Sequence, residues 1–132
     1  FAASVVAFEG SSSYFQGGTV AYQREAKETQ LGIDSTLLDQ YGMVSAECAK
    51  AMAEQARLHY QSDLGISFTG VAGPSEMEGK EVGTIFVALA SRTDVEVLEL
   101  HLARNRNDNR EFAVQHGWNL LRKYFLKQVR TK

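Results

Sequence analysis

Tyr22 and Lys27 lie five residues apart, just after a short apolar run, and both side chains can exchange protons. A lysine amine that has lost its proton is a base, and it can activate a serine hydroxyl for attack on a carbonyl carbon. The helix dipole disfavours a lysine in the first turns of a helix by about 0.3–1 kcal/mol. The spacing leaves two interpretations open: chemistry at the mouth of a sheet, or polar residues on the surface of a strand-to-helix turn.

Two further segments have the residue types of an anion site. The segment TGVAGP, residues 69–74, combines glycines with the only proline of the chain, so its backbone N–H groups are candidates to hold an anion or a developing oxyanion. The segment ARNRNDNR, residues 103–110, places Arg104, Arg106 and Arg110 around the start of a helix, which suits a phosphate or a carboxylate. Taken alone, such segments are more often a tight turn and a solvated helix start.

Other reactive side chains carry weaker signals. His59, His101 and His116 stand singly, with no pair at metal-ligand spacing, so we expect neither a metal nor a cofactor. Cys48 falls in a helical pattern beside small and apolar residues, so a role as a small core residue is favoured over one as a nucleophile.

Composition limits the classes of function. At 132 residues, with 44% apolar and 23% charged residues, the chain reads as one globular domain. A net charge of −2 gives no basic field for nucleic acid, and no apolar run approaches the ~20 residues of a membrane span. The single cysteine cannot form an internal disulfide, which fits a reducing cytoplasm.

Strands and helices alternate along the chain and must position these residues. The stretch 82–90 is nearly all apolar, as expected of a strand covered on both faces, and 95–102 alternates, as expected of a strand near an edge, antiparallel to its predecessor. The interleaving predicts an α/β fold, a three-layer α/β/α sandwich with a mixed, mostly parallel sheet. The expected strands are 14–22, 63–70, 82–90 and 95–102, and the expected helices are 1–8, 24–32, 33–42, 45–60 and 108–127.

Six segments, in this order, resemble the CinA C-terminal domain family, which includes the nicotinamide-nucleotide amidases (PncC). They are GSSSYFQGGTVAYQREAK, LGI, YGMVSAECAKAMAEQAR, SDLGISFTGVAGP, VGTIFVALA and RNDNREFAVQHGWNLL, and the resemblance runs from residue 1 to about residue 125. It implies an amidohydrolase that converts nicotinamide mononucleotide to nicotinic acid mononucleotide and ammonia. The implied mechanism uses a serine nucleophile paired with a lysine and needs no metal.

The resemblance also implies roles for individual residues. Lys27 and Tyr22 match the lysine and tyrosine of the family's Tyr-x-x-x-x-Lys pattern, which makes them the catalytic candidates. The positions implied to bind substrate are Thr69, Gly70, Gly73, Arg106 and Arg110.

The serine motif of the family would lie just before Phe1, and Ser11, Ser12 and Ser13 fall in the family's ordinary turn. We therefore expect one N-terminally truncated domain over residues 1–132, inactive by itself, with a nucleotide-binding domain ahead of it in the parent protein. The implied partner is a pyridine mononucleotide in the cytoplasm, with no nucleic acid and no membrane. A homo-oligomer is compatible with so small a domain.

Two other functions stay open. The first is a non-catalytic interaction or regulatory module of a competence/damage-inducible CinA protein. Retention of Tyr22, Lys27, Thr69, Arg106 and Arg110 argues against it. The second is a nucleotide pyrophosphatase of similar topology, which would need carboxylates for Mg²⁺. Glu76 and Glu78 are the candidates for that role, and a solvated loop is the commoner explanation for them.

Overall fold

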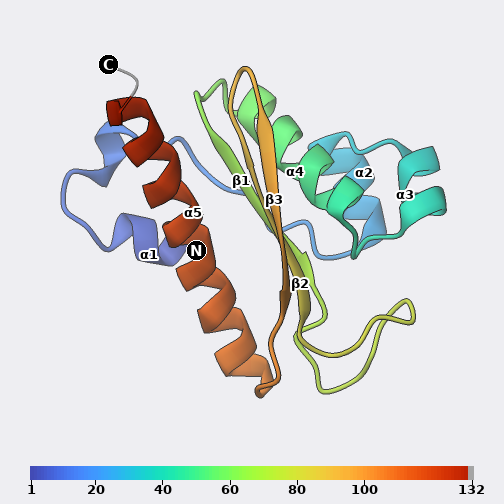
Figure 1. The fold of residues 1–132 in the computed structure, drawn as a ribbon. Coiled ribbons are helices and arrows are strands. Elements are labelled where there is room, and N and C mark those ends of the chain that lie inside the picture. Colours follow the sequence, from blue (N-terminus) through green and yellow to red (C-terminus); the bar gives the residue numbers. More distant parts are fainter. Residues whose placement is uncertain (131–132) are drawn as a thin grey trace.

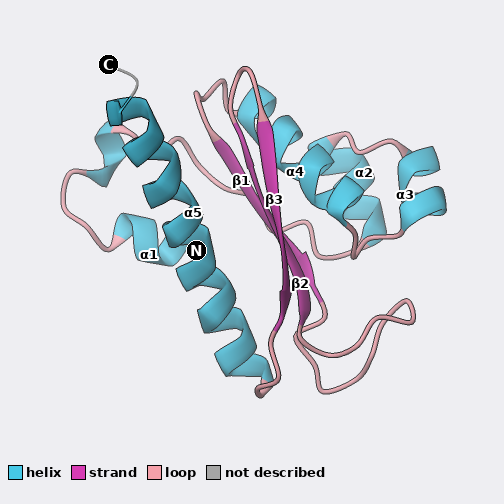
Figure 2. Cartoon of the chain, in the orientation of Figure 1, coloured by secondary structure: helices cyan, strands magenta, loops and turns pink. Residues whose placement is uncertain are grey.

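Helices cover both faces of a small sheet in the computed structural model, which describes residues 1–130 (Figures 1 and 2). Helix α4 (Ala46–His59) lies on one face, with α2 (Arg24–Leu31) and α3 (Ser35–Tyr41) beyond it. Helix α5 (Arg106–Arg130) crosses the other face, accompanied by α1 (Ala2–Val6) and the short 3₁₀ turn η1 (Ser11–Ser13). The α/β class expected from the sequence is confirmed, and no helix within residues 1–130 is long and apolar enough to cross a membrane.

The sheet has three strands in the order β1 (Gly65–Gly70), β2 (Thr84–Ala90) and β3 (Val95–His101), and both pairs are antiparallel. The expectation of a mixed, mostly parallel sheet is therefore wrong, whereas the antiparallel pairing of the last two strands is confirmed. Parallel neighbours need a crossover connection of a dozen or more residues, usually a helix. Here the loop 71–83 and the turn 91–94 contain no helix, and each returns the chain to the adjacent position in the opposite direction.

The strand expected over residues 14–22 does not form. Residues 15–22 have no regular secondary structure, and Val20 and Tyr22 are 89% and 70% exposed. Aromatic and β-branched residues favour a strand because they pack on a pleated, half-buried surface. Without a neighbouring strand among residues 1–130, most side chains of this segment lie in solvent, although Ala21 is buried.

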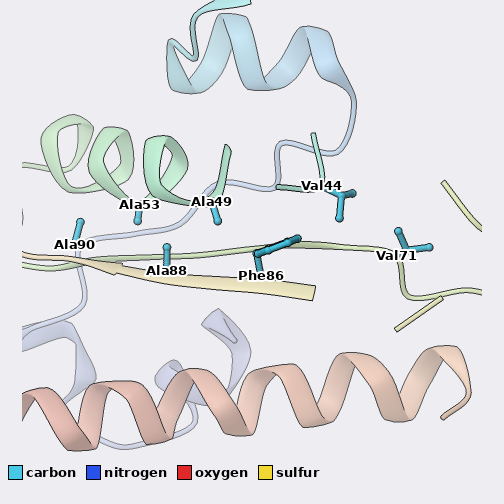
Figure 3. Close-up of a cluster of buried hydrophobic side chains, with 7 residues drawn as sticks. All are labelled: Val44, Ala49, Ala53, Val71, Phe86, Ala88 and Ala90. Atoms are coloured by element: carbon cyan, nitrogen blue, oxygen red, sulfur yellow. The ribbon is translucent and has the colours of Figure 1, made fainter. Parts of the chain in front are cut away.

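β2 is buried at every position because it is the central strand and helices cover both of its faces. Its side chains alternate between two hydrophobic clusters, one on each face of the sheet. The strand is therefore apolar along nearly its whole length although its pairing is antiparallel. Phe86, Ala88 and Ala90 belong to the cluster on the α4 side (Figure 3), and Ile85, Val87 and Leu89 belong to the cluster that includes residues of α5.

Small residues bring α4 very close to the sheet. Ala49 and Ala53 of the helix are fully buried in the cluster of Figure 3, and the Ser67 hydroxyl on β1 donates to the Ala49 carbonyl at 2.6 Å. Gly65 leaves no room for a side chain, because a Cβ there would lie 2.2 Å from the Ala53 carbonyl oxygen and 2.8 Å from the Arg57 nitrogen. Helix α4 begins with a side-chain cap, because the Ser45 side chain accepts a hydrogen bond from the Cys48 N–H.

We expect Gly65→Ala to lower the free energy of unfolding by about 1–3 kcal/mol, because helix and strand backbones must separate to admit the methyl group. Gly18→Ala is the matched control, since a Cβ at Gly18 would meet nothing closer than 3.8 Å. It should change stability by less than about 0.5 kcal/mol. Urea denaturation of both variants measures the difference, and equal stabilities would contradict the close approach of α4 to β1.

Candidate active site

Lys27 is buried in the helix α2, with only 6% of its surface exposed. Its Nζ donates to the Ala21 carbonyl, 2.6 Å away, in the segment that leads into the helix. The helix ends at Gly32, whose left-handed backbone (φ 67°) lets its N–H return to the Lys27 carbonyl. The lysine is therefore held by its backbone within the helix and by its side chain at the segment before the helix.

The surroundings of Lys27 weaken its hold on a proton. Burial lowers the pKa of Lys27, because the charged form loses its hydration, while Cys48, when it is ionised, and Glu78 act to raise it. Burial also raises the pKa of the Cys48 thiol to about 11, so the thiol stays neutral near pH 7. Cys48 is fully buried, which confirms the prediction that it is a core residue.

Arg24, one helical turn before Lys27, has carboxylate partners of its own. Its guanidinium donates to Glu28 and to Asp39, and these bonds raise the pKa of Arg24. Desolvation is thus the cause that lowers the pKa of Lys27, and no neighbouring cation contributes.

Arg106, the first residue of α5, joins two of the other candidate segments. Its Nη1 donates to the Gly73 carbonyl at 2.6 Å, and its Nη2 donates to the Tyr22 hydroxyl at 3.3 Å. Tyr22 follows Ala21, the residue whose carbonyl accepts from Lys27. Arg106 therefore joins Tyr22 and Gly73 directly, and Lys27 is connected to this pair through the backbone of Ala21.

The glycines of the loop after β1 permit close packing. Gly73 is buried with φ 101°, a backbone that disfavours side chains, and a Cβ there would lie 2.6 Å from Val82 Cγ1. A Cβ on Gly70 would lie within 3 Å of Ile85 and the Thr84 carbonyl oxygen. The Thr69 hydroxyl donates to the Met43 carbonyl at 2.6 Å, so it fixes the strand end to the segment before α4.

Asn109 is a site residue that sequence reasoning missed. Its side chain is fully buried, and its Nδ2 donates to the carbonyls of Ala72 (3.0 Å) and Arg104 (2.9 Å). Its Oδ1 accepts from the Arg104 N–H at 3.2 Å. The signal was present: Asn109 lies four residues before Ala113 on the apolar stripe of the helix, where a polar residue requires hydrogen-bond partners.

The other two arginines of this segment differ. Arg110 is exposed, and its side chain makes no hydrogen bond or ion pair with any of residues 1–130. Burial and the Arg110 charge lower the pKa of the Phe1 amino group, so the start of the chain lies within electrostatic reach of Arg110. Arg104 instead lies over the Phe112 ring, 4.4 Å from its centroid.

The two loop glutamates do not form a carboxylate cluster. Glu78 accepts from the N–H groups of Met43 and Val44, both at 2.9 Å, so both of its oxygens have backbone partners. Over residues 1–130, no three side chains of the His, Cys, Asp and Glu types are placed to hold a metal ion.

Asn109→Ala should lower the free energy of unfolding by about 3 kcal/mol or more, because several buried backbone groups lose a partner at about 1–3 kcal/mol each. Asn107, exposed on the same turn of α5, gives the control, and Asn107→Ala should change stability by less than about 0.5 kcal/mol. Chemical denaturation measures both variants. An unchanged denaturation midpoint in Asn109→Ala would show that the buried side-chain amide does not hold the loop 71–83.

Comparisons with known proteins agree with one another. In Streptococcus pneumoniae, proteins named as competence-damage inducible, including that of strain D39, are 48% identical to this chain over 127 residues. The match covers 96% of the chain but 30% of each relative, so the chain spans about a third of the length of the curated relatives it matches.

Solved structures share the fold. The competence damage-inducible protein A of Klebsiella pneumoniae matches with a TM-score of 0.92 at 25% identity, over 95% of this chain and 78% of that one. A CinA-superfamily protein of Escherichia coli matches with a TM-score of 0.88 at 26% identity, over 91% and 70% of the two chains. The family model described as the CinA C-terminal domain matches residues 1–125, and this chain therefore belongs to the CinA C-terminal domain family.

Proposed function

We propose that this chain is the amidase domain of a CinA protein, and that it deamidates nicotinamide mononucleotide to nicotinic acid mononucleotide and ammonia in the cytoplasm. The observation that carries the proposal is the buried amine of Lys27, whose pKa burial lowers. An amine needs a low pKa to accept a proton from a serine hydroxyl near neutral pH. In the full-length protein the serine comes from the segment that precedes Phe1.

The position of that serine is consistent with the contacts of the described residues. The Phe1 amino group lies within electrostatic reach of Arg110, so the preceding segment joins the chain in the neighbourhood of one candidate substrate-binding arginine. β1 pairs with β2 along one edge and has no partner among residues 1–130 along the other. A preceding strand that ran parallel to β1 on that edge would end near the loop that carries Gly73.

The chemistry then follows in two stages. Lys27 removes the serine proton as the serine oxygen bonds to the carboxamide carbon, and the proton passes to the nitrogen as the C–N bond breaks and ammonia leaves. A water molecule, deprotonated by the same amine, attacks the acyl ester and releases the acid and the free serine. Tyr22 accepts a hydrogen bond from Arg106 and keeps its own phenolic proton, which it can donate to the reacting groups.

Backbone groups and Arg110 supply the remaining functions. The N–H groups of Ala72 and Gly73 donate to no other group within residues 1–130, while their carbonyls are held by Asn109 and Arg106. A peptide fixed in this way suits stabilisation of a developing oxyanion, since its donors need no reorganisation. Arg110, exposed and without a partner among residues 1–130, is the arginine we assign to the substrate phosphate.

A non-catalytic interaction or regulatory module is the second candidate, favoured by the names of the relatives, which refer to competence and damage. Such a module has no use for a desolvated amine. Burial of Lys27 is unfavourable for the ammonium form, and a surface-exposed residue would serve a binding module at lower cost. The buried lysine therefore favours the amidase.

In the full-length protein, Lys27→Met should lower kcat by about 100- to 10,000-fold, because the variant fills a similar buried volume but has no base. Lys27→Arg should lower kcat almost as much, since a guanidinium does not release its proton near neutral pH. Lys50→Met changes an exposed lysine of α4 and should leave kcat unaltered. Ammonia release from nicotinamide mononucleotide measures all three variants.

The pH dependence gives the second part of this test. Only the neutral amine accepts a proton, so the rate should rise with pH, and burial should put the midpoint below 10.5, the ordinary lysine pKa. Near-normal turnover of Lys27→Arg would show that the residue supplies positive charge alone, and would remove the serine–lysine mechanism.

Arg110→Ala should raise KM for the mononucleotide by about 10- to 100-fold, because one charge-assisted contact to the phosphate is lost. The same change should leave turnover of nicotinamide riboside, which has no phosphate, unaltered. Arg106→Ala should instead lower kcat for both substrates, since it frees Gly73 and Tyr22 together. If the wild-type protein uses both substrates equally well, Arg110 does not bind the phosphate.

A further inference from the structure

Glu78 occupies an unusual position at the tip of the loop 71–83. Met77 and Lys80 pair with each other, so Glu78 and Gly79 form the two central residues of a tight turn. Both have positive φ, 54° at Glu78 and 71° at Gly79. Glycine, asparagine and aspartate are the usual residues in such a turn, and a glutamate is strained there. Strain at a single residue persists only where its surroundings hold it, and it often marks function.

The Glu78 carboxylate sits in a cradle of backbone atoms between α3 and α4. Its Oε2 accepts from the Met43 N–H and its Oε1 from the Val44 N–H, both at 2.9 Å. A Cβ on Gly42 would lie 2.9 Å from Oε1 and would displace the carboxylate from this position, and the φ of 79° at Gly42 also favours glycine. Two separate parts of the chain are thus shaped to fit this one side chain.

The cradle is continuous with the candidate site. The carbonyl of Met43 accepts from the Thr69 hydroxyl at the end of β1. At the start of the loop, Asn109 and Arg106 hold the carbonyls of Ala72 and Gly73. The loop is therefore fastened to α5 at its base and to the layer of α2, α3 and α4 at its tip.

We propose that Glu78 is a positioning residue of the site: its carboxylate fastens the loop that carries Gly73 to the segment before α4, and supplies a negative charge that acts on Lys27. The assignment rests on the proposed function only for the role that it gives Lys27 as a base. The contacts and the charge of Glu78 are properties of the chain and can be measured without turnover.

The effect of the Glu78 charge follows from the groups that act on the Lys27 amine. These are Cys48 of α4 and Glu78 of the loop. Because the pKa of the Cys48 thiol is about 11, the thiol carries no charge at neutral pH, and Glu78 remains as the charged neighbour. Glu78 favours the ammonium form and burial favours the neutral amine, so the two together set the pH at which Lys27 becomes a base.

The test replaces Glu78 by glutamine in the full 132-residue chain, with Glu76→Gln as the matched control two residues away on the same loop. Glu76 is exposed and has no hydrogen bond or ion pair within residues 1–130. An NMR titration of the Lys27 amine should give a lower pKa in Glu78→Gln and no change in Glu76→Gln. Amide exchange at Met43 and Val44 should become about 10-fold faster or more in Glu78→Gln alone, as expected on loss of a charged acceptor.

An unchanged Lys27 titration in folded Glu78→Gln, or unchanged exchange at Met43 and Val44, overturns the proposal. Glu78→Asp serves if the glutamine variant does not fold, because aspartate tolerates positive φ and keeps the charge while its shorter side chain cannot reach both N–H groups. It should speed amide exchange while leaving the Lys27 pKa close to that of the unmodified chain. Unchanged amide exchange at Met43 and Val44 in Glu78→Asp overturns the proposal. A Lys27 pKa in Glu78→Asp that is as low as expected with no charge at position 78 also overturns it.

In the full-length protein, Glu78→Gln should also move the rise of the pH–rate profile to lower pH. Absence of turnover in the unmodified protein would count against the amidase and leave the titration and exchange results to decide the role of Glu78.

Discussion

Two N–H groups of Arg106, one directed to the Gly73 carbonyl and the other to the Tyr22 hydroxyl, connect segments 33 and 84 residues away in the chain. A guanidinium can do this because its donors are fixed in a plane and point in different directions, whereas a lysine ammonium offers one flexible point charge. Asn109, in the next turn of α5, locks the same helix start to Ala72. The start of α5 thereby sets the relative positions of the loop after β1 and the segment before α2.

Burial of Lys27 is the second constraint, and it is the more demanding one. A lysine with an ordinary pKa near 10.4 needs a shift of roughly three units, about 4 kcal/mol, to be half neutral at pH 7. Desolvation lowers the pKa of Lys27, and Arg24, which is paired with carboxylates, is not among the groups that act on it. Glu78 acts in the opposite direction. Such a balance can be adjusted by small movements of a loop, which a pair of fully buried charges would not permit.

The features predicted correctly from the sequence are local ones. The helices expected over residues 24–32, 33–42, 45–60 and 108–127 form as α2, α3, α4 and α5, because each depends on neighbouring residues, such as the capping side chains of Asp34 and Ser45. The predictions of a mostly parallel sheet and of a strand over residues 14–22 were wrong. Both depend on which segments of the chain are neighbours in the fold. Strand composition records a half-buried environment and not the identity of a neighbour.

In the candidate site, too, the role of a single side chain depends on its neighbours in the fold. Thr69, Arg106, Asn109 and Glu78 all have polar side chains, yet each is hydrogen-bonded to backbone and so serves to fix the geometry. Sequence reasoning cannot separate such residues from those left free to meet a ligand, because only the folded contacts reveal which donors and acceptors are already satisfied. Of the candidate site groups within residues 1–130, the Arg110 guanidinium and the N–H groups of Ala72 and Gly73 have no hydrogen-bond partner, and the Lys27 amine donates to the Ala21 carbonyl alone. Together with a serine from the segment before Phe1, one base, one cation and two fixed donors are the groups on which the proposed amidase function relies.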